Sequence, residues 1–319
     1  MQDTDTDTTR FDIWLVDGFI LTEYAAIVDV LRIANRLMLK PKFSWHNLST
    51  DGGTIQCRAD AYVDTVPPTQ FPDADYLLVL GNSDPTWPGK SMGRIIDRYV
   101  ARQTKVILLA EAASRYIAEK GDTGLTTHWE NRAILQEQIG LQSTNQTLAT
   151  ERGQIITSAG MGSTVDMILT LLARHISAAT VTTVADILLH DRIRDLGTFQ
   201  PFGGKRIVLT GDRMLDQSIE LMQANLEEPL PIAQIVELLG VSSRSLERRF
   251  RSRLSTRPAE YYRALRLNKA NNLLLNTALP INEIALACGF PSGFTPHYRA
   301  QFGMTPQTVR QRKREGVRG

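Results

Sequence analysis

The sequence is poor in cysteine, in aromatic residues and in long apolar runs. Cys57 and Cys288 are the two cysteines among 319 residues, which excludes a disulfide-stabilised scaffold and favours a reducing, cytoplasmic location. The longest apolar runs, such as YLLVL and VILLA, have strand length, whereas a membrane-spanning helix needs roughly 20 residues, so no membrane partner is expected. The first ten residues, MQDTDTDTTR, have no apolar core and do not form a signal peptide. We expect residues 1–10 to be a disordered leader.

Charge is distributed unevenly along the chain. Residues 213–319 contain 16 Lys and Arg and 9 Asp and Glu, a net charge of +7, whereas the first 212 residues carry a net charge of −5. A basic segment attached to an acidic body is typical of a domain that binds a polyanion. The alternative is a solvated basic surface without a partner, and the motifs in the basic segment decide between the two.

The first half of the chain alternates between patterns of buried strands and of helices. The segments FDIWLVD (11–17), DYLLVLG (75–81) and KVILLAE (105–111) are apolar and of strand length, and helical periodicity follows the first of them at residues 22–38. Strands that are apolar throughout and alternate with helices predict a parallel sheet covered on both faces. We expect this α/β domain to span residues 11–190. A linker follows at 191–213, where charged residues, glycine and proline occur without periodicity.

Residues 232–254 have the pattern of a helix-turn-helix unit. An apolar helix face ends at Gly240, which suits a left-handed turn, and Ser242 or Ser243 can cap the helix that follows. On that second helix Leu246 and Phe250 are expected to face inward. Arginine can bond bidentately to guanine, and glutamate can accept a hydrogen bond from cytosine. The side chains expected to contact bases from this helix are Arg244, Glu247 and Arg248.

A second helix-turn-helix pattern follows at residues 281–303. Phe294, Tyr298 and Phe302 repeat every four residues, which indicates a packed helix face rather than a surface that stacks on bases. Pro296 lacks an N–H and is tolerated only in a first helical turn, so this helix is expected to start late. One such pattern alone also fits an ordinary helical hairpin, but two in tandem favour binding to double-stranded DNA. From this second helix, the side chains expected to contact bases are Thr295 and His297. Phosphate contacts, which position a protein without specifying a sequence, are expected for Ser243, Arg249, Arg253, Lys269 and Arg299.

The basic segment resembles the DNA-binding domain of the AraC/XylS family over residues 214–315. The matching segments are SSRSLERRFR, RPAEYYRALRLNKANNLLL, INEIALACGF and FGMTPQTVRQ. The resemblance implies an all-α tandem helix-turn-helix domain whose two recognition helices enter successive segments of the major groove. It also places Arg244, Glu247 and Arg248 at the base-reading positions of the first recognition helix. The second unit departs from the family pattern, because it is about two residues shorter between Phe290 and Tyr298.

The first half resembles the ThiJ/PfpI and class I glutamine-amidotransferase-like superfamily, in the form fused to AraC-type regulators. The matching segments are VDVLRIANR, PPTQFPDADYLLVLG, AEKGDTGLTTHWE and ITSAGMGSTVDMILTLLARH. This implies a flavodoxin-like α/β parallel sheet sandwich that senses a ligand and dimerises. Enzymes of the superfamily carry a nucleophilic cysteine on the turn after the strand KVILLA, and Glu111 falls there within about one residue. A carboxylate is a poor substitute for a thiolate in amide or acyl transfer, so we predict no catalytic residue and no enzyme activity.

The same resemblance places Glu23 at the acid beside the nucleophile position, with His128 and Trp129 close by. Two carboxylates in a confined site repel each other unless they are protonated or neutralised, and an aromatic wall favours quaternary ammonium or guanidinium groups. We therefore expect Glu23, Glu111, His128 and Trp129 to bind a small cationic or amino-acid- or betaine-like nitrogen compound. The alternative is that Glu111 caps the helix that follows it and that His128 is a structural histidine. No cofactor is expected, and no His/Cys spacing supports a metal site.

These features predict a cytoplasmic, homodimeric transcription regulator that is activated or modulated by a small nitrogenous effector, and they leave open whether it is an activator or a repressor. Two alternatives stay open at this point. One is an amidase- or glyoxalase-like enzyme fused to a DNA-binding domain, for which a cysteine at position 111 would be the expected mark. The other is a ligand-independent DNA-binding protein whose α/β domain serves only to dimerise.

Overall fold

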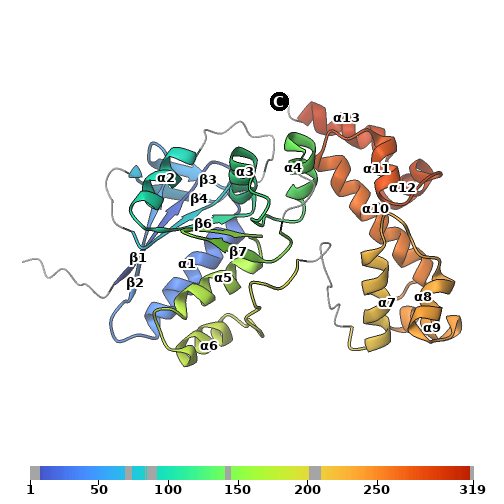
Figure 1. Ribbon diagram of the computed structural model, residues 1–319, viewed down its shortest axis with the longest axis horizontal. Coiled ribbons are helices and arrows are strands. Elements are labelled where there is room, and N and C mark those ends of the chain that lie inside the picture. The colour runs from blue at the N-terminus through green and yellow to red at the C-terminus, as the bar shows by residue number, and fades with distance from the viewer. Residues whose placement is uncertain are drawn as a thin grey trace, which may run out of the picture. The chain divides into compact units, whose positions relative to one another are not determined.

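The chain divides into two compact units, Met1–Phe199 and Gln200–Gly319 (Figure 1). The structure, a computed structural model, describes residues 8–68, 74–82, 84, 92–140, 145–200 and 210–316. Most of the expected leader lies outside the described residues. Its last two residues, Thr9 and Arg10, already belong to the first strand, because Thr9 pairs with Phe43 in the sheet. Each unit is described separately below.

The central sheet of the first unit has six strands in the described part of the chain. The strands of the unit are β1 (Thr9–Trp14), β2 (Phe43–Leu48), β3 (Gly53–Gln56), β4 (Tyr62–Thr65), β5 (Tyr76–Val79), β6 (Lys105–Leu109), β7 (Ala149–Arg152) and β8 (Ile155–Ser158). The sheet has the order β2-β1-β5-β6-β8-β7, and β3 and β4 form a separate antiparallel pair. All neighbours in the sheet are parallel except β7, which pairs antiparallel with β8 at the edge. The order of the five parallel strands is that of a flavodoxin-like fold, which confirms the predicted fold class.

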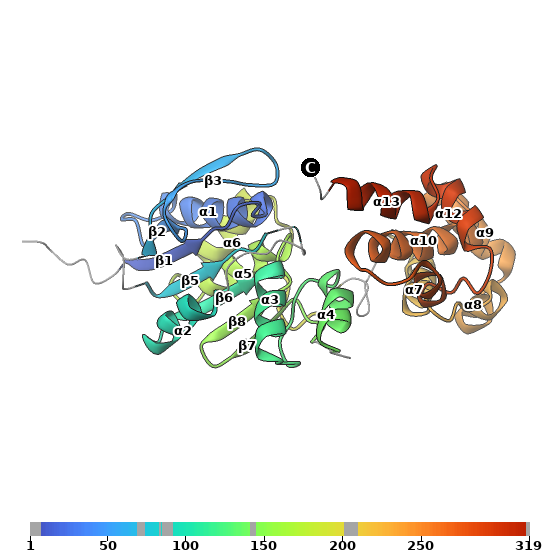
Figure 2. The same ribbon diagram turned by 90° about the horizontal axis from the view of Figure 1, so that it is seen from above.

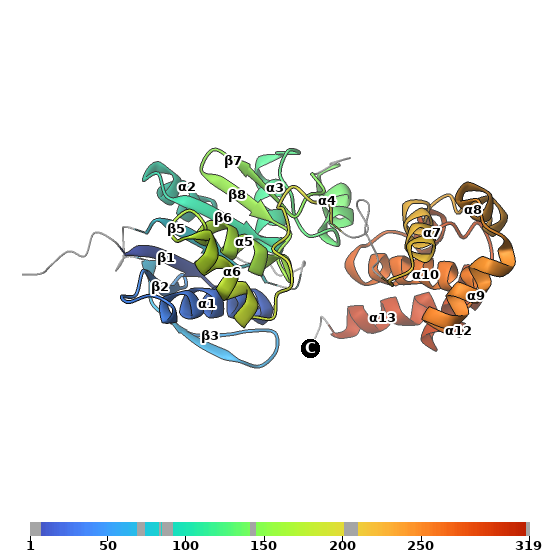
Figure 3. The same cartoon turned by 90° about the horizontal axis from the view of Figure 1, so that it is seen from below.

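Helices cover both faces of this sheet. They are α1 (Leu21–Arg36), α2 (Gly93–Ala101), α3 (Ala110–Lys120), α4 (Asn131–Ile139), α5 (Ser163–Leu172) and α6 (Ala178–Ile187). Helices α1, α5 and α6 pack together on one face, where Ile27, Leu169 and Val184 are buried, whereas α2 and α3 bury Ile96 and Ala113 on the other face. Figure 2 shows α1 and α2 on opposite sides of the strands, and Figure 3 shows α5 and α6 beside α1. This double coverage explains why the strands read as apolar throughout.

The carboxyl ends of the parallel strands meet at one edge of the sheet. In the sheet, β2 lies on one side of β1, and β5 lies on the other side. The strand order therefore reverses at β1, and this edge of the sheet contains the point of reversal. In open α/β sheets such a point is where ligands bind. Glu23 lies in the first turn of α1, Glu111 follows β6, and Met161 follows β8, so all three are carried to this edge.

The second unit consists of helices in its described residues. They are α7 (Arg213–Ala224), α8 (Ile232–Leu239), α9 (Ser243–Leu254), α10 (Pro258–Asn276), α11 (Ile281–Ala287), α12 (Phe294–Phe302) and α13 (Pro306–Gly316). Helices α8 and α9 lie within the predicted range 232–254, and α11 and α12 lie within 281–303. Leu215, Ile235 and Phe250 are buried together and join α7, α8 and α9. No helix in the described ranges of either unit is long and apolar enough to cross a membrane.

The first unit extends further along the chain than the sequence indicates. Residues 191–199 were expected to be part of a linker, but their backbone is bonded to the sheet edge. The N–H groups of Leu148 and Ala149 donate to the carbonyls of Thr198 and Leu196 at 2.8 and 2.9 Å. A segment held by pairing to one strand edge needs no apolar periodicity, which is why the pattern did not reveal it. Residues 201–209 of the expected linker lie outside the described residues.

Candidate DNA interface and effector site

Helix α9 presents one apolar face and one polar face. Leu246 and Phe250 are completely buried in the core of the second unit. The helix begins where expected, because the Ser242 hydroxyl accepts the N–H of Ser245 at 3.2 Å and caps its N-terminus. The opposite face is exposed and carries Arg244, Glu247, Arg248 and Arg251. The structure therefore places the three predicted base-reading residues together on the outer face of one helix.

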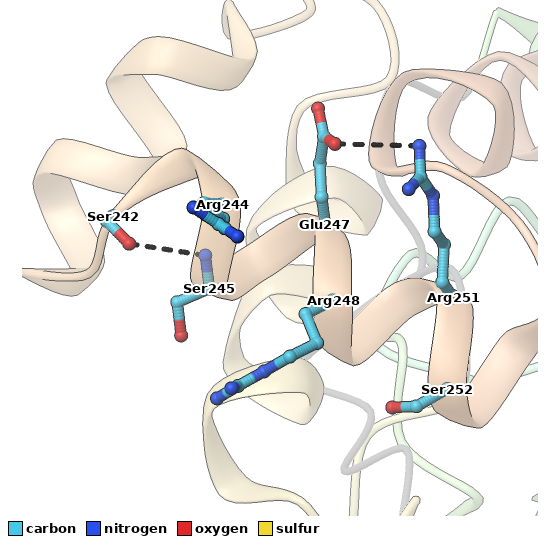
Figure 4. A pocket seen from close by; sticks show the side chains of 7 residues that line it. All are labelled: Ser242, Arg244, Ser245, Glu247, Arg248, Arg251 and Ser252. Atoms are coloured by element: carbon cyan, nitrogen blue, oxygen red, sulfur yellow. Dashed lines mark hydrogen bonds and ion pairs between the residues drawn. The ribbon is translucent and has the colours of Figure 1, made fainter.

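A hollow of about 680 Å³ lies along this exposed face of α9 (Figure 4). It is lined by Ser242, Arg244, Ser245, Glu247, Arg248, Arg251 and Ser252. Arg248 extends away from the helix in Figure 4, and no ion pair of the described residues involves Arg244 or Arg248. Glu247 lies 3.8 Å from Arg251, an exposed pair one helical turn apart. Such a pair contributes only about 0.3–0.5 kcal/mol, so it does not prevent Glu247 from accepting a hydrogen bond from a base.

Two of the predicted phosphate contacts have internal partners instead. Arg249 Nη1 donates to the carboxylate of Asp212 at the start of α7, and its Nε is buried. Lys269 Nζ donates to the carbonyl of Ala287 at 2.8 Å, at the end of α11. Both cations therefore hold helices of the second unit together, and phosphate contacts at these two positions stay a prediction. The other three predicted phosphate-contact residues, Ser243, Arg253 and Arg299, are exposed.

Helix α12 differs from α9 in length and in surface chemistry. It has 9 residues and α9 has 12. Pro296 is its third residue, within the first turn, where the missing N–H removes no helical hydrogen bond. Thr295 and His297 are exposed, as predicted. The hollow next to this helix is lined mainly by apolar groups such as Leu286 and Phe290, whereas the hollow of α9 is lined by charged groups.

The aromatic residues of α12 form a packed face. Phe294 and Tyr298 are buried, and the rings of Phe290, Phe294, Tyr298 and Phe302 follow one another with centroid distances of 5.6, 5.5 and 4.6 Å. The Tyr298 hydroxyl donates to the side chain of Asn271 in α10. These aromatics anchor α12 to α10 and are not available to stack on bases, in agreement with the prediction.

Glu23 is a buried carboxyl group with one unpartnered oxygen. Its side chain is fully buried, and Oε1 accepts the N–H of Met161 at 2.9 Å. Oε2 is buried and has no hydrogen-bond partner among the described residues. Burial, together with the nearby charge of Glu111, raises the pKa of Glu23 from 4.5 to about 8. In the free protein this group therefore holds a proton at neutral pH.

Glu111 lies one residue after a strained turn. Ala110, the first residue of α3, has a φ of +36°, so Ala110 rather than Glu111 occupies the turn after β6. A Cβ atom on Gly160 would lie 2.0 Å from Glu23 Oε1 and 2.8 Å from Ala110 Cβ. Glu23 and Ala110 therefore converge on Gly160, a position that admits no side chain. Neither position 110 nor position 111 is a cysteine, and both cysteines are buried elsewhere.

The carboxyl group of Glu111 resembles that of Glu23 in its surroundings. Burial raises its pKa to about 7, against the effect of hydrogen bonds from its own N–H and from Asn131. Its Oε2 is buried and has no hydrogen-bond partner in the described part of the chain. The bond to its own N–H, in the first turn of α3, is also what the capping alternative requires. The structure thus brings two protonatable carboxyls to one edge of the sheet, each with an unpartnered oxygen.

The turn that carries His128 and Trp129 is fastened to Ala110. Thr127 Oγ1 donates to the Ala110 carbonyl at 2.7 Å, and Asn131 Nδ2 donates to Thr127 Oγ1 at 3.3 Å. Burial lowers the pKa of His128 to about 4, so its ring is neutral at pH 7. Nδ1 lies 3.4 Å from the backbone nitrogen of Glu130 and 3.5 Å from its Oε2. The rings of His128 and Trp129 lie 5.5 Å apart.

Thr127 and Asn131 are partners of the candidate site residues that the sequence did not predict. The signal available was the segment TTHWEN itself, in which they flank the two predicted ligand residues. A polar side chain in a loop gives no periodicity, so only the fold shows that these two bond to Ala110 and Glu111. In the part of the chain that the structure describes, no group of three or more His, Cys, Asp or Glu is arranged to hold a metal ion.

Comparison with known proteins gives matches to both halves of the chain. A family model described as a helix-turn-helix domain matches residues 235–312. The HTH-type transcriptional regulator GbdR of Pseudomonas aeruginosa is 32% identical and covers 93% of this chain and 83% of its own length. The HTH-type transcriptional regulator GlxA of Rhizobium meliloti is 27% identical, with 95% of this chain and 96% of that protein covered. A proposed transcriptional regulator from Vibrio parahaemolyticus has a solved structure with a TM-score of 0.50 and 14% identity, covering 57% of this chain and 99% of that one. This last likeness concerns the fold alone.

Proposed function

The chain belongs to the AraC family of helix-turn-helix transcriptional regulators, and we propose that a small cationic metabolite bound between Glu23 and Glu111 controls how it binds DNA. The family follows from the identity to GbdR along most of both chains. Because the curated relatives are transcriptional regulators, they support the prediction that the chain is a regulator rather than an enzyme.

The observation that carries the proposal is the pair of unpartnered buried oxygens on Glu23 and Glu111. An ionised carboxylate buried without a partner is strongly unfavourable, so in the free protein both groups retain protons to an unusually high pH. A cationic group placed between them supplies the missing partner and displaces those protons. An anionic group at the same place would add a third negative charge and would be rejected.

The neighbouring aromatic turn fits the same class of ligand. The indole of Trp129 offers a face to a quaternary ammonium or guanidinium group. The neutral ring of His128 carries one N–H group, which can donate to the carboxylate of an amino-acid- or betaine-like molecule. A zwitterion with its cationic end at the two carboxyls and its carboxylate at His128 would satisfy both ends of the site.

In the second unit, we propose that α9 reads bases through Arg244, Glu247 and Arg248. Exposed Arg253 and Arg299 contact phosphates, and Ser243 can do so from the first turn of α9. We propose that Thr295 and His297 of the shorter helix α12 make a smaller contribution to base reading. A homodimer would present two such sets of helices to two half-sites. A ligand changes DNA binding when its affinity differs between two arrangements of the protein, because it then favours one arrangement over the other.

The test is ligand binding by the full chain, followed by thermal unfolding and calorimetry. The probes are glycine betaine, choline and arginine, with succinate as the anionic control. A cationic probe at 100 times its Kd stabilises the folded state by about 2.7 kcal/mol, which is visible as a rise in Tm. Glu23→Gln and Glu111→Gln should each weaken that probe tenfold or more, whereas Glu119→Gln, an exposed carboxyl on the same helix as Glu111, should leave it unchanged. Uniform absence of stabilisation by the cationic probes would favour the ligand-independent dimer instead.

A further inference from the structure

Asp166 of α5 is a buried carboxylate that gathers one short segment of the chain around itself. It is completely buried. Oδ1 accepts from His190 Nε2 at 2.9 Å and from the Arg194 backbone N–H at 2.7 Å, and Oδ2 accepts from Arg194 Nε and Nη2 at 2.9 and 2.6 Å. Every one of these donors lies in residues 190–194. We call residues 190–199 the strap.

The strap ends where the first unit ends. Beyond Arg194 it runs along the edge of the sheet, where the carbonyls of Leu196 and Thr198 accept backbone N–H groups and Phe199 forms a bridge with Thr147. Phe199 is the last residue of the first unit. The strap is therefore the part of the α/β unit from which the chain continues into the helix-turn-helix unit.

Arg194 also touches the turn that receives Glu23. Its Nη2 donates to the carbonyl of Gly162 at 2.9 Å, in addition to the three bonds that Arg194 makes to Asp166. Gly162 follows Met161, whose N–H donates to Glu23 Oε1 and whose φ is +50°. The turn 160–162 is thus held by Glu23 at the peptide that enters Met161 and by Arg194 at the peptide that leaves Gly162.

From this arrangement we infer that Arg194 is a positioning residue that transmits the state of Glu23 to the strap. The inference rests on the proposed function, in which Glu23 is part of the effector site. A ligand that draws the Glu23 carboxyl away from the Met161 N–H frees the peptide between Gly160 and Met161 to rotate. The Gly162 carbonyl belongs to the peptide between Gly162 and Ser163, two peptides further along the same tight turn, so its bond to Arg194 changes with it.

The chemistry of arginine suits this role. Its planar fork donates from Nε and Nη2 to one carboxylate while Nη2 also reaches a carbonyl, which the single ammonium of lysine cannot reproduce in the same geometry. Because Asp166 is completely buried, it keeps hold of the arginine when the Gly162 bond changes. A shift of the turn therefore moves the strap rather than releasing it.

Hydrogen–deuterium exchange on the full chain, without any ligand, tests the coupling. Glu23→Ala removes the bond to Met161 and should speed amide exchange both in residues 160–164 and in the strap. The expected increase is on the order of tenfold in each region, which corresponds to a loss of about 1.4 kcal/mol in local stability. In an Arg194→Lys background, which keeps a cation beside Asp166, the same change should speed exchange only in residues 160–164. Arg192→Ala, which removes an exposed arginine of the same strap, should leave the response of the strap to Glu23→Ala intact.

The inference is overturned if Glu23→Ala speeds exchange at residues 160–164 but not in the strap, or if the strap responds equally in the Arg194→Lys background. Glu23→Asp, which withdraws the carboxyl by one methylene, serves as the second perturbation and covers the case in which Glu23→Ala does not fold. A purely structural role for Arg194 would change the basal exchange of the strap but not its response to position 23. Because no ligand is present, a failed ligand screen and a failed coupling experiment remain distinguishable.

Discussion

Replacement of Glu23 by glutamine should change how the stability of the α/β unit depends on pH. The pKa of Glu23 is about 8 in the folded chain and 4.5 without the protein environment. Between these two values the folded chain retains a proton that the unfolded chain has released. The folded state binds more protons over this window, so its stability falls as pH rises from about 4.5 to about 8.

The size of the effect follows from the same two values. One pKa unit corresponds to about 1.4 kcal/mol, and between pH 5 and pH 8 the Glu23 proton alone accounts for a loss of about 3 kcal/mol. Glutamine is neutral and of the same size, and its carbonyl oxygen can still accept the Met161 N–H. The Glu23→Gln chain should therefore match the wild type near pH 5 and be the more stable of the two by about 3 kcal/mol at pH 8.

Urea unfolding followed by tryptophan fluorescence measures this difference in the right part of the molecule. The described tryptophans, Trp14, Trp45 and Trp129, lie in the first unit, and the sequence contains no tryptophan after position 129. The fluorescence therefore reports the unfolding of this unit and not that of the helix-turn-helix unit. Glu119→Gln removes an exposed carboxyl from α3 and is the matched control, expected to parallel the wild type. If the free energy of unfolding of the Glu23→Gln chain has the same pH dependence as that of the wild type from pH 5 to pH 8, Glu23 is not a buried, protonated group and the reasoning fails.

Four further outcomes are expected. Arg248→Ala should cost about 1–3 kcal/mol in binding to the preferred DNA site and relax preference at one base pair, measured by competition with single-base variants. Arg253→Ala should weaken binding to all sequences alike and reduce the salt dependence of log K by about 1, which titrations at several salt concentrations would show. Arg249→Ala, which leaves Asp212 without its partner, should lower the Tm of the second unit, whereas a pure phosphate contact would leave Tm unchanged. Affinity for a cationic ligand should rise from pH 6 to pH 8. The pKa values of Glu23 and Glu111 are about 8 and 7, so the binding of a cation displaces protons from these groups. Calorimetry in buffers of different ionisation enthalpy would detect the released protons.

The sequence predicted the recognition helices well because their signals are local. Gly240 ends α8 with a φ of +63°, and Ser242 caps α9. Leu246 and Phe250 are four residues apart and are both buried, which fixes the residues of α9 that face outward. The exposed face of this helix could therefore be predicted from the spacing of its apolar residues alone. Nothing in that argument requires knowledge of a distant part of the chain.

The contacts that the sequence did not predict depend on distant partners. Arg249 meets Asp212, which is 37 residues away, and Lys269 meets a carbonyl 18 residues away. A cation on a recognition helix, as at Arg249, or on the helix next to it, as at Lys269, gives the same sequence signal whether or not it also bonds to another helix of its own unit. The strap escaped prediction for the same reason, since one buried carboxylate and pairing at a sheet edge order it without any apolar repeat.

The strained turn at Ala110 gives a physical reason to regard the carboxyl pair as a binding site. A non-glycine residue at positive φ costs about 1–3 kcal/mol and persists only where its surroundings over-determine it. Here a Cβ on Gly81 would lie 2.6 Å from Glu111 Cβ, and the Ala110 carbonyl is held by Thr127. The methyl group of Ala110 performs no covalent chemistry, so the strain does not serve to present a nucleophile. What the turn does achieve is to set Glu111 at the start of α3, near enough for its charge to raise the pKa of Glu23. The strained turn therefore holds two carboxyl groups close together, and we propose that this arrangement becomes favourable for their ionised forms once a cation lies between them.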